Sequence, residues 1–351
     1  MNTMYVIRLA LLWISTFASA NSQTRDSFRV FWNVPSFACH KYGINIDVSS
    51  TWGIIQNSGD VFRGERLTIL YDPGDFPALI KDSSGKFQPR NGGVPQEGNL
   101  THHLQVLSNY VDRVVTDKNF SGLGVIDMES WRPIFRQLFG SFLPYKDYSY
   151  NIERKRHPWW IRTQIEEVAA SRFESAAHEF MKDSLELIRQ MRPHGQWGYY
   201  AFPYCFNTVL DYCKKDVQAE NNRIQWLFDE SNVLYPSIYL AEKQPQSTRV
   251  NFMRGRVAEA RRVAKRTGRL QGPQIYAYVR FVYHDTLKYL SHEDIFNSIN
   301  IPKQLQLNGV MIWGSSNDLN TKEKCQNLQK YVDTVLGPVV RNVTGTNNNI
   351  S

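Results

Sequence analysis

The chain has 351 residues, of which 42% are hydrophobic, and a formal net charge of +8 from 41 Lys and Arg against 33 Asp and Glu. Its length allows one large domain or two smaller ones, and the absence of a Gly/Ser- or Pro-rich linker favours one. The positive charge suits a polyanionic partner by long-range attraction, although a basic surface that serves only solubility is an alternative.

The first twenty residues predict a secretory signal peptide. A short segment with one basic residue, Arg8, precedes a mostly apolar run at 9–17, and Ala18-Ser19-Ala20 has the small-x-small pattern of a cleavage site. This run is too short to span a bilayer, and no later segment is long and apolar enough. We therefore expect a secreted, single-domain protein over residues 21–351, whose polar tail from Asn342 onward argues against a lipid anchor or stable membrane association. In that setting an acidic glycan is a better candidate partner than nucleic acid.

Short apolar runs typical of buried strands recur along the chain. In order, they are residues 28–32, 67–71, 123–126, 197–200, 233–239, 275–278 and 310–313. Apolar residues at helical spacing predict helices between several of them, at 161–191, 250–266 and 322–336. This alternation predicts an α/β fold with a parallel sheet covered by helices. A closed (β/α) barrel and an open doubly wound sheet both fit, but no G-x-G-x-x-G follows the first strand, which weakens the nucleotide-binding version.

The third apolar run ends in two carboxylates, Asp127 and Glu129. Side chains alternate along a strand, so these two carboxylates share one face. Two such groups resist ionising together, so the pKa of one should rise and supply a proton donor, as glycoside cleavage requires. Because D-x-E is a common triplet, a pair that only solvates a loop is an equal alternative on spacing alone.

Several other expected strands also end in polar or aromatic residues. In a barrel, the carboxyl ends of the strands build the active site. Here those ends carry Asp72, Asp127 with Glu129, Tyr200, Tyr239 and Trp313. Aromatic faces stack on pyranose rings and polar groups bind their hydroxyls, so this collection indicates a sugar-binding cleft, although each aromatic taken singly favours a role in the core.

Four cysteines occur, and an even number in a secreted chain favours disulfides, with three possible connectivities. Cys205 and Cys213 are close enough for a local bridge, which would leave Cys39 to pair with Cys325. Metal binding is the alternative, but no C-x-x-C or H-x-x-x-H spacing supports it.

Asn-x-Ser/Thr sequons at Asn99, Asn119 and Asn342, and one at the terminal Asn349, are candidate glycan acceptors. The eight histidines are scattered, and the pair His102-His103 is interpreted as a solvated helix face. We expect no metal and no cofactor.

Taken together, these segments resemble the hyaluronidase family (glycoside hydrolase family 56), especially its hymenopteran venom members. The matching pieces follow one another over nearly the whole mature chain, at residues 31–35, 71–74, 76–79, 90–96, 122–137, 197–200, 203–205, 234–239 and 312–318. This extent moves the interpretation of Asp127 and Glu129 from loop solvation to catalysis. The likeness also suggests venom as the secretion, although reproductive or digestive secretions would use the same fold.

The resemblance implies a distorted (β/α) barrel that cleaves β-1,4 N-acetylglucosaminide bonds in hyaluronan, with chondroitin as a further candidate substrate. Glu129 falls on the family's proton donor, and Asp127 on the residue that orients the substrate's acetamido group. That group attacks the anomeric carbon, and water opens the resulting oxazolinium with retained configuration. Such substrate assistance is an exception to the carboxylate-nucleophile scheme.

By the same resemblance, Tyr200 and Tyr239 position the acetamido group, and Trp313 forms the floor beneath that sugar. Ser315, Ser316 and Arg132 match positions near the cleft, although Arg132 could instead pair with a structural acid. The cysteines match too, implying Cys39–Cys325 and Cys205–Cys213. The chain departs from the venom pattern at Arg280, which would add a cation to the cleft, and in a shorter loop between Cys205 and Cys213.

Two alternative functions and one alternative mechanism can be weighed from the residues. A catalytically silent glycan-binding homologue would typically lack the acid, whereas Asp127, Glu129 and Tyr200 are all present. A lyase would need a base at the uronate C5, and nothing in the sequence indicates one. Serine catalysis is disfavoured because Gly314-Ser315-Ser316 lacks the G-x-S-x-G elbow. We expect a monomeric hydrolase.

Overall fold

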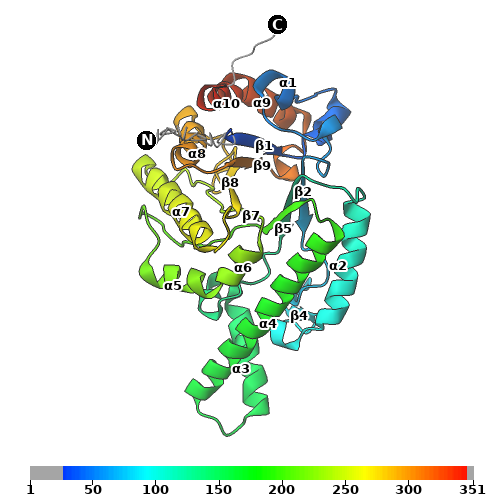
Figure 1. Ribbon diagram of the computed structural model, residues 1–351, viewed down its shortest axis with the longest axis vertical. Coiled ribbons are helices and arrows are strands. Elements are labelled where there is room, and N and C mark those ends of the chain that lie inside the picture. Colours follow the sequence, from blue (N-terminus) through cyan, green and yellow to red (C-terminus); the bar gives the residue numbers. More distant parts are fainter. Residues whose placement is uncertain (1–26, 346–351) are drawn as a thin grey trace, which may run out of the picture.

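The computed structural model describes residues 27–345, so the predicted signal peptide at 1–20 and the sequon at Asn349 lie outside the described residues. Parallel strands form the centre of the molecule, and helices surround them (Figure 1). The seven parallel strands are β1 Arg29–Asn33, β2 Leu67–Tyr71, β5 Leu123–Asp127, β6 Gln196–Tyr199, β7 Val233–Leu234, β8 Gln274–Arg280 and β9 Gly309–Trp313. A separate antiparallel hairpin consists of β3 Ala78–Lys81 and β4 Phe87–Arg90.

The strands form two sheets, β1-β9-β8-β7 and β2-β5-β6, that close into one barrel. An isolated bridge between Tyr200 and Tyr235 joins β6 to β7. At the opposite seam, between β1 and β2, Ile55 pairs with β1, and the Asn57 side chain binds both the N–H and the C=O of Leu67 at 3.0 Å. A loop and a side chain therefore replace a strand at this seam, which makes the barrel a distorted one. The predicted single-domain (β/α) barrel is confirmed.

One face of each strand fills the barrel interior, and the other packs against the surrounding helices. The alternation is visible in β2 and β5, where every second apolar residue points inward. Close packing on the helix-facing side of the strands requires Gly124, because a Cβ there would lie 2.1 Å from the Trp197 ring. The buried residues of the interior cluster are Phe31, Leu67, Ile69, Leu123, Val125, Val233, Tyr235, Tyr276, Tyr278 and Met311.

The helices are α1 Val48–Trp52, α2 Leu100–Val114, α3 Leu143–Arg156, α4 Arg162–Met191, α5 Lys215–Arg223, α6 Gln225–Glu230, α7 Gln246–Arg266, α8 His292–Gln304, α9 Lys322–Tyr331 and α10 Gly337–Thr344. The predicted helix at 161–191 matches α4 to within one residue, and α7 begins four residues before its predicted start at 250. The predicted helix at 322–336 is α9 followed by a π-helical turn at Val332–Leu336. Across residues 27–345, none of the helices combines the length and the apolar character needed to cross a membrane.

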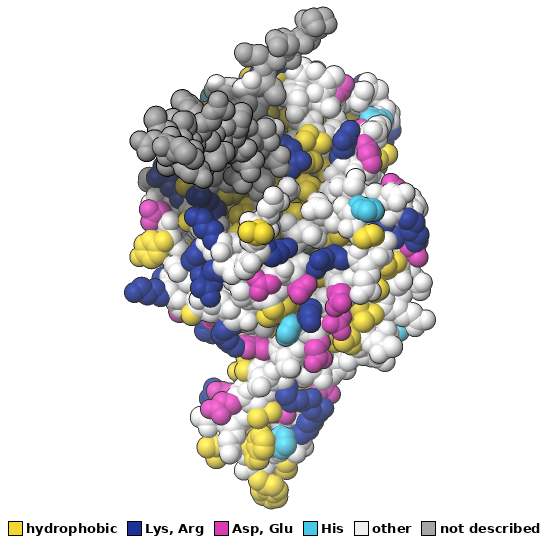
Figure 2. Space-filling model, in the orientation of Figure 1, with side chains coloured by type: hydrophobic (Ala, Val, Ile, Leu, Met, Phe, Trp, Pro, Cys, Tyr) yellow, Lys and Arg dark blue, Asp and Glu magenta, His cyan; other side chains and the backbone are white. Residues whose placement is uncertain are grey.

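Helices α3 and α4 form a hairpin that projects from the barrel (Figure 1), with hydrophobic side chains gathered at its far end (Figure 2). At 1.5 Å per residue, the 30 residues of α4 span about 45 Å, whereas a five-residue strand spans only about 16 Å. Since α4 ends just before β6 begins, its first half extends past the opposite end of the barrel, where the strands have their carboxyl ends. Fully buried Glu153 pairs with Arg172 between the two helices and fixes the hairpin.

Two expectations from the sequence are corrected by the structure. The strand predicted at 233–239 is only Val233–Leu234, because Pro236 has no N–H to continue a ladder. His103 is fully buried rather than solvated, with its Nε2 2.8 Å from the Ser184 hydroxyl and its Nδ1 accepting from the Asp75 N–H at 2.9 Å. Burial lowers the pKa of His103 to about 4, so it stays neutral and serves packing.

Candidate active site at the carboxyl ends of the strands

Asp127 and Glu129 lie at the carboxyl end of β5 and face a pocket of about 310 Å³. Asp127 is the last residue of the strand and pairs in register with Tyr71 of β2, and its carbonyl accepts from the Asp72 N–H at 2.7 Å. The pocket is lined by Tyr71, Asp72, Asp127, Glu129 and Ser130. The two adjacent strands therefore bring three carboxylates to one opening.

The pair Asp127 and Glu129 binds protons more tightly than isolated carboxyls do. Burial is the largest cause and raises the pKa of both groups, even though Glu129 as a residue borders the open cleft. The charge of Glu129 raises the pKa of Asp127 further. Neither group has an ion-pair partner among residues 27–345, and the buried Asp127 Oδ1 has no hydrogen-bond partner there. The pair is thus suited to share one proton.

Asp72 has different surroundings, although it borders the same pocket. Both of its oxygens bind the Arg90 guanidinium, Oδ2 from Nη1 at 2.5 Å and Oδ1 from Nη2 at 3.1 Å. Asp72 follows β2, and Arg90 ends β4, so the small hairpin provides this cation. The arrangement occupies both oxygens of Asp72 in an ion pair with Arg90.

An aromatic wall faces the carboxylates from the ends of four strands. Trp313, at the end of β9, donates from Nε1 to the Tyr71 hydroxyl at 2.9 Å and stacks on Tyr239 with ring centroids 5.9 Å apart. Tyr200 follows β6 and donates to the Ser237 hydroxyl at 3.3 Å. Burial raises the pKa of Tyr71 to about 12 and that of Tyr200 higher still, so both phenols remain protonated hydrogen-bond donors.

Arg132 lies in a cage of aromatic rings beside the pair. Its Nη1 donates to the Gln137 carbonyl at 2.7 Å, and no acid forms an ion pair with it among residues 27–345. Its positive charge lowers the pKa of Glu129, opposing the effect of burial. Four ring centroids lie within 5.0 Å of its guanidinium carbon, those of Phe139, Phe142, Tyr204 and Phe206.

Arg256 is a cation near the site that the sequence analysis missed. It donates from Nη1 to the Ser237 carbonyl at 2.7 Å, and burial lowers its pKa to about 10. No carboxylate pairs with it among the described residues. The sequence pattern of α7 could have indicated Arg256, because it lies next to Val257 and three positions after Met253, both on the buried face of the helix. A cation at the edge of an apolar stripe indicates that its side chain contacts polar groups outside its own helix.

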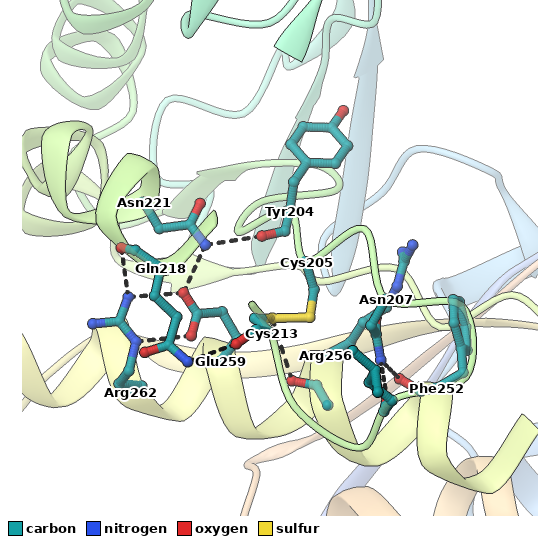
Figure 3. The surroundings of a disulfide bond; sticks show 12 residues. Tyr204, Cys205, Asn207, Cys213, Gln218, Asn221, Phe252, Arg256, Glu259 and Arg262 are labelled. Carbon is teal, nitrogen blue, oxygen red and sulfur yellow. Dashed lines mark hydrogen bonds and ion pairs between the residues drawn. A yellow bond between two sulfur atoms is a disulfide. The ribbon is translucent and has the colours of Figure 1, made fainter. Parts of the chain in front are cut away.

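The Cys205–Cys213 disulfide lies directly after Tyr204 (Figure 3), one ring of the Arg132 cage, and closes the loop that carries a second ring, Phe206. Asn207 Nδ2 donates to the Phe252 carbonyl at 3.0 Å and so binds the loop to α7. Asn221 Nδ2 donates to the Tyr204 carbonyl at 2.8 Å and to Glu259 at 2.6 Å. These contacts fix the loop on both sides of the disulfide. The second disulfide joins Cys39 to Cys325.

The segment after β9 holds Ser315 and Ser316 next to Trp313. The Ser315 hydroxyl accepts from the Asn317 N–H at 3.2 Å, and its own N–H donates to Asp318, so it caps the 3-10 turn Ser316–Asp318. Arg280 forms two 3.0 Å hydrogen bonds with Asp318, while its guanidinium carbon lies 5.4 Å from the centre of the Trp313 ring. The expected extra cation is therefore present but paired with an acid.

The three described sequon asparagines, Asn99, Asn119 and Asn342, are all exposed. Asn99 also caps α2, because its side-chain oxygen accepts from the His102 N–H at 3.0 Å. Across residues 27–345, no three His, Cys, Asp or Glu side chains gather where they could hold a metal ion.

Comparison with known proteins gives one consistent result. The family model described as hyaluronidase, of glycoside hydrolase family 56, matches residues 18–351. The hyaluronidase of Apis mellifera is 44% identical over 334 residues, which cover 93% of this chain and 87% of the relative. That of Vespa magnifica is 43% identical over 325 residues, covering 90% of each chain.

A solved structure of bee venom hyaluronidase in complex with a hyaluronic acid tetramer is also similar. Its TM-score with this chain is 0.88 at 44% sequence identity, and the match covers 90% of this chain and 99% of that one. The likeness therefore includes the barrel and the segments at the carboxyl ends of its strands.

Proposed function

Because this chain belongs to the hyaluronidase family, glycoside hydrolase family 56, we propose that it is a secreted endo-glycosidase that hydrolyses the β-1,4 N-acetylglucosaminide bonds of hyaluronan. The bee venom relative has been solved with a hyaluronic acid tetramer, which supports the same substrate class here. Chondroitin, a polyanion of similar backbone, is a second substrate. We propose that the protein acts as a monomer and needs no metal or cofactor.

The observation that carries the proposal is the state of Asp127 and Glu129. The two carboxyls hold a proton at elevated pKa, have no ion-pair partner among the described residues, and leave the buried Asp127 Oδ1 without a hydrogen bond. A buried acceptor without a partner costs stability, so it is suited to a donor that arrives with the substrate. The N–H of an acetamido group is such a donor.

In the first step, the acetamido N–H donates to Asp127 and favours its ionised form, which places the shared proton on Glu129. The acetamido oxygen then attacks the anomeric carbon while Glu129 donates its proton to the departing glycosidic oxygen. The C–O bond breaks, and a cyclic oxazolinium forms whose positive charge lies beside the Asp127 carboxylate. In the second step, Glu129 removes a proton from water, which opens the ring with retained configuration.

The closeness of Asp127 and Glu129 supports substrate assistance over a carboxylate nucleophile. A retaining enzyme of the usual kind holds its two carboxyls about 5–5.5 Å apart, with the second one next to the anomeric carbon. Here the two side chains lie within hydrogen-bonding distance of each other, and the third carboxylate of the pocket, Asp72, is held through both oxygens by Arg90. The acetamido oxygen is therefore the nucleophile in this proposal.

The aromatic and basic side chains have complementary roles. Tyr200 and Tyr239 position the acetamido group with their protonated phenols, and Trp313 stacks beneath that sugar ring. Ser315, Ser316 and the unpaired cation Arg132 bind sugar hydroxyls or a glucuronate carboxylate. Arg256 adds a second unpaired cation on the Tyr200 side, which suits the next acidic sugar.

The test is digestion of hyaluronan by the purified secreted chain, with Glu129→Gln and the matched control Glu179→Gln. Glu179 is an exposed acid on α4, far in sequence from the pocket. Saturated oligosaccharides with N-acetylglucosamine at the reducing end, abolished only by Glu129→Gln, are expected. Binding without cleavage from acidic to neutral pH would identify a silent homologue, and unsaturated uronates would identify a lyase.

A further inference from the structure

The far end of the α3–α4 hairpin is an exposed projection with several large apolar side chains. It consists of residues 157–161, His-Pro-Trp-Trp-Ile, between the two helices. Trp159 is 93% exposed, Ile161 65% and Trp160 40%. Large apolar side chains grouped on an exposed projection disfavour solubility, so such a group indicates an interaction site. Figure 2 shows this hydrophobic cluster at the bottom of the molecule.

Basic residues surround the apolar end. Arg154, Lys155, Arg156 and Arg162 lie within nine positions, and no acidic residue falls among them. Arg156 pairs with Glu97 and Arg162 with Glu166, whereas neither Arg154 nor Lys155 has an acidic partner in residues 27–345. The end of the hairpin therefore carries a positive charge that the protein itself leaves uncompensated.

The hairpin holds this end in a defined position. His157 and Trp160 stack face to face, with centroids 3.7 Å apart at 6°, and the Glu153–Arg172 pair lies just below them. The apolar end is convex and projects from the body (Figure 1). Small ligands and sugars bind mostly in concave sites, so a convex group of this kind suits an extended, deformable surface.

We propose that residues 154–162 form a docking surface for anionic lipid membranes. Tryptophan is favoured at the membrane–water boundary, where its ring lies among the headgroups. An exposed isoleucine adds apolar burial, and neighbouring Lys and Arg side chains bind anionic headgroups. The contact is shallow and reversible, unlike a membrane span or a lipid anchor.

Docking in this way would orient the catalytic cleft. The end of the hairpin lies on the side of the barrel where the strands have their carboxyl ends, since α4 returns from it to the start of β6. A membrane bound there would face the cleft across the length of the projecting hairpin. Polysaccharide lying close to a cell surface would then be presented to Asp127 and Glu129.

The experiment is co-sedimentation of the mature chain with phosphatidylcholine vesicles, with and without phosphatidylserine. The variants are Trp159→Ser with Ile161→Ser, and Arg154→Gln with Lys155→Gln. The matched control is Leu270→Ser, an equally exposed apolar residue far from the hairpin. All substituted side chains are exposed, so folding should be preserved, which thermal unfolding and cleavage of dissolved hyaluronan both check.

Wild type should bind vesicles that contain phosphatidylserine and bind neutral vesicles weakly. The apolar double variant should lose on the order of tenfold or more in affinity, and each removed charge about fivefold. Binding should weaken as salt rises, because the Debye length falls from about 10 Å at 0.1 M to about 3 Å at 1 M. The Leu270 control should bind like wild type.

Three results would overturn the proposal. One is absence of vesicle binding by wild type, and another is equal binding by wild type and the apolar double variant. The third is that the hairpin variants lose affinity for hyaluronan, or dissociate a dimer, while vesicle binding does not change. Vesicle binding does not require catalysis, so its failure would leave the proposed hydrolase unaffected.

Discussion

Two neighbouring strands of the barrel both end in carboxylates, and their surroundings differ in one respect. At the end of β2, the two carboxylate oxygens of Asp72 accept hydrogen bonds from Nη1 and Nη2 of the Arg90 guanidinium. At the end of β5, Asp127 and Glu129 lie against each other at the edge of the cleft, with partly buried carboxyls and no ion-pair partner among the described residues. Burial favours the protonated form of a carboxyl, and a nearby cation opposes this effect. The comparison indicates that burial without a paired cation lets the β5 pair retain a proton, as the proposed role of Glu129 requires.

The largest effect should come from removing the proposed proton donor. Glu129→Gln keeps the shape of the side chain but cannot transfer the proton, so kcat on hyaluronan should fall by about 10²–10⁴-fold with little change in KM. Reducing-end assays with Glu179→Gln as control measure this. A variant that retained most of its activity would assign the donor to another group.

Asp127→Asn should lower activity without lowering the stability of the fold at neutral pH. Activity should fall by about 10²-fold or more, because a neutral amide could not offset the positive charge of the proposed oxazolinium intermediate. Burial raises the pKa of Asp127 in the folded protein above its value in the unfolded chain. The folded state therefore binds the proton more tightly, which stabilises the fold in acid, and this stabilisation is lost as pH rises through the folded-state pKa. The variant should therefore unfold at the same or a higher denaturant concentration than wild type at neutral pH, and this advantage should fade in acid.

Arg132 should set the basic limb of the pH profile. Hydrolysis needs one proton on the pair, so activity falls when pH exceeds the higher pKa of the pair and also when both groups are protonated. Because its charge lowers the pKa of Glu129, Arg132→Met should move the basic limb to higher pH by up to about one unit. Arg132→Lys keeps the charge and should leave the limb near its original position.

The smallest effect should come from breaking the β2 pair. Asp72→Asn removes the partner of Arg90, but 41% of the Asp72 side chain and 30% of the Arg90 side chain are exposed. Such a pair contributes up to about 1 kcal/mol, so the free energy of unfolding should fall only slightly. Since the charge of Asp72 raises the pKa of Asp127, the basic limb should shift modestly to lower pH. A loss of activity as large as that of Glu129→Gln would contradict the comparison.

Much of the barrel followed from local patterns. The strand at 67–71 matches β2 residue for residue, and α4 was predicted to within one position. Apolar runs and helical spacing reflect burial on one or two faces, and that signal lies within a few consecutive residues. The shared face of Asp127 and Glu129 follows from strand geometry for the same reason.

Features that depend on distant contacts did not follow from the sequence. The burial of His103 depends on Ser184, which is 81 positions away, and nothing near His103 indicates that contact. The aromatic cage of Arg132 needs rings from before α3 and from the Cys205–Cys213 loop. Asn57 closes the barrel through its side chain, which mimics a peptide group that no strand pattern contains. The absence of a counter-ion for Asp127 could only be established in three dimensions.

The Cys39–Cys325 disulfide has a consequence for proteolysis. Its half-cystines are 286 positions apart, and both are fully buried. A single cut anywhere between them would leave two fragments that remain covalently joined as well as packed in one barrel. A nicked molecule would migrate as one species on a denaturing gel until it was reduced. For a protein proposed to act among extracellular proteases, a broken chain would still hold its catalytic strands together.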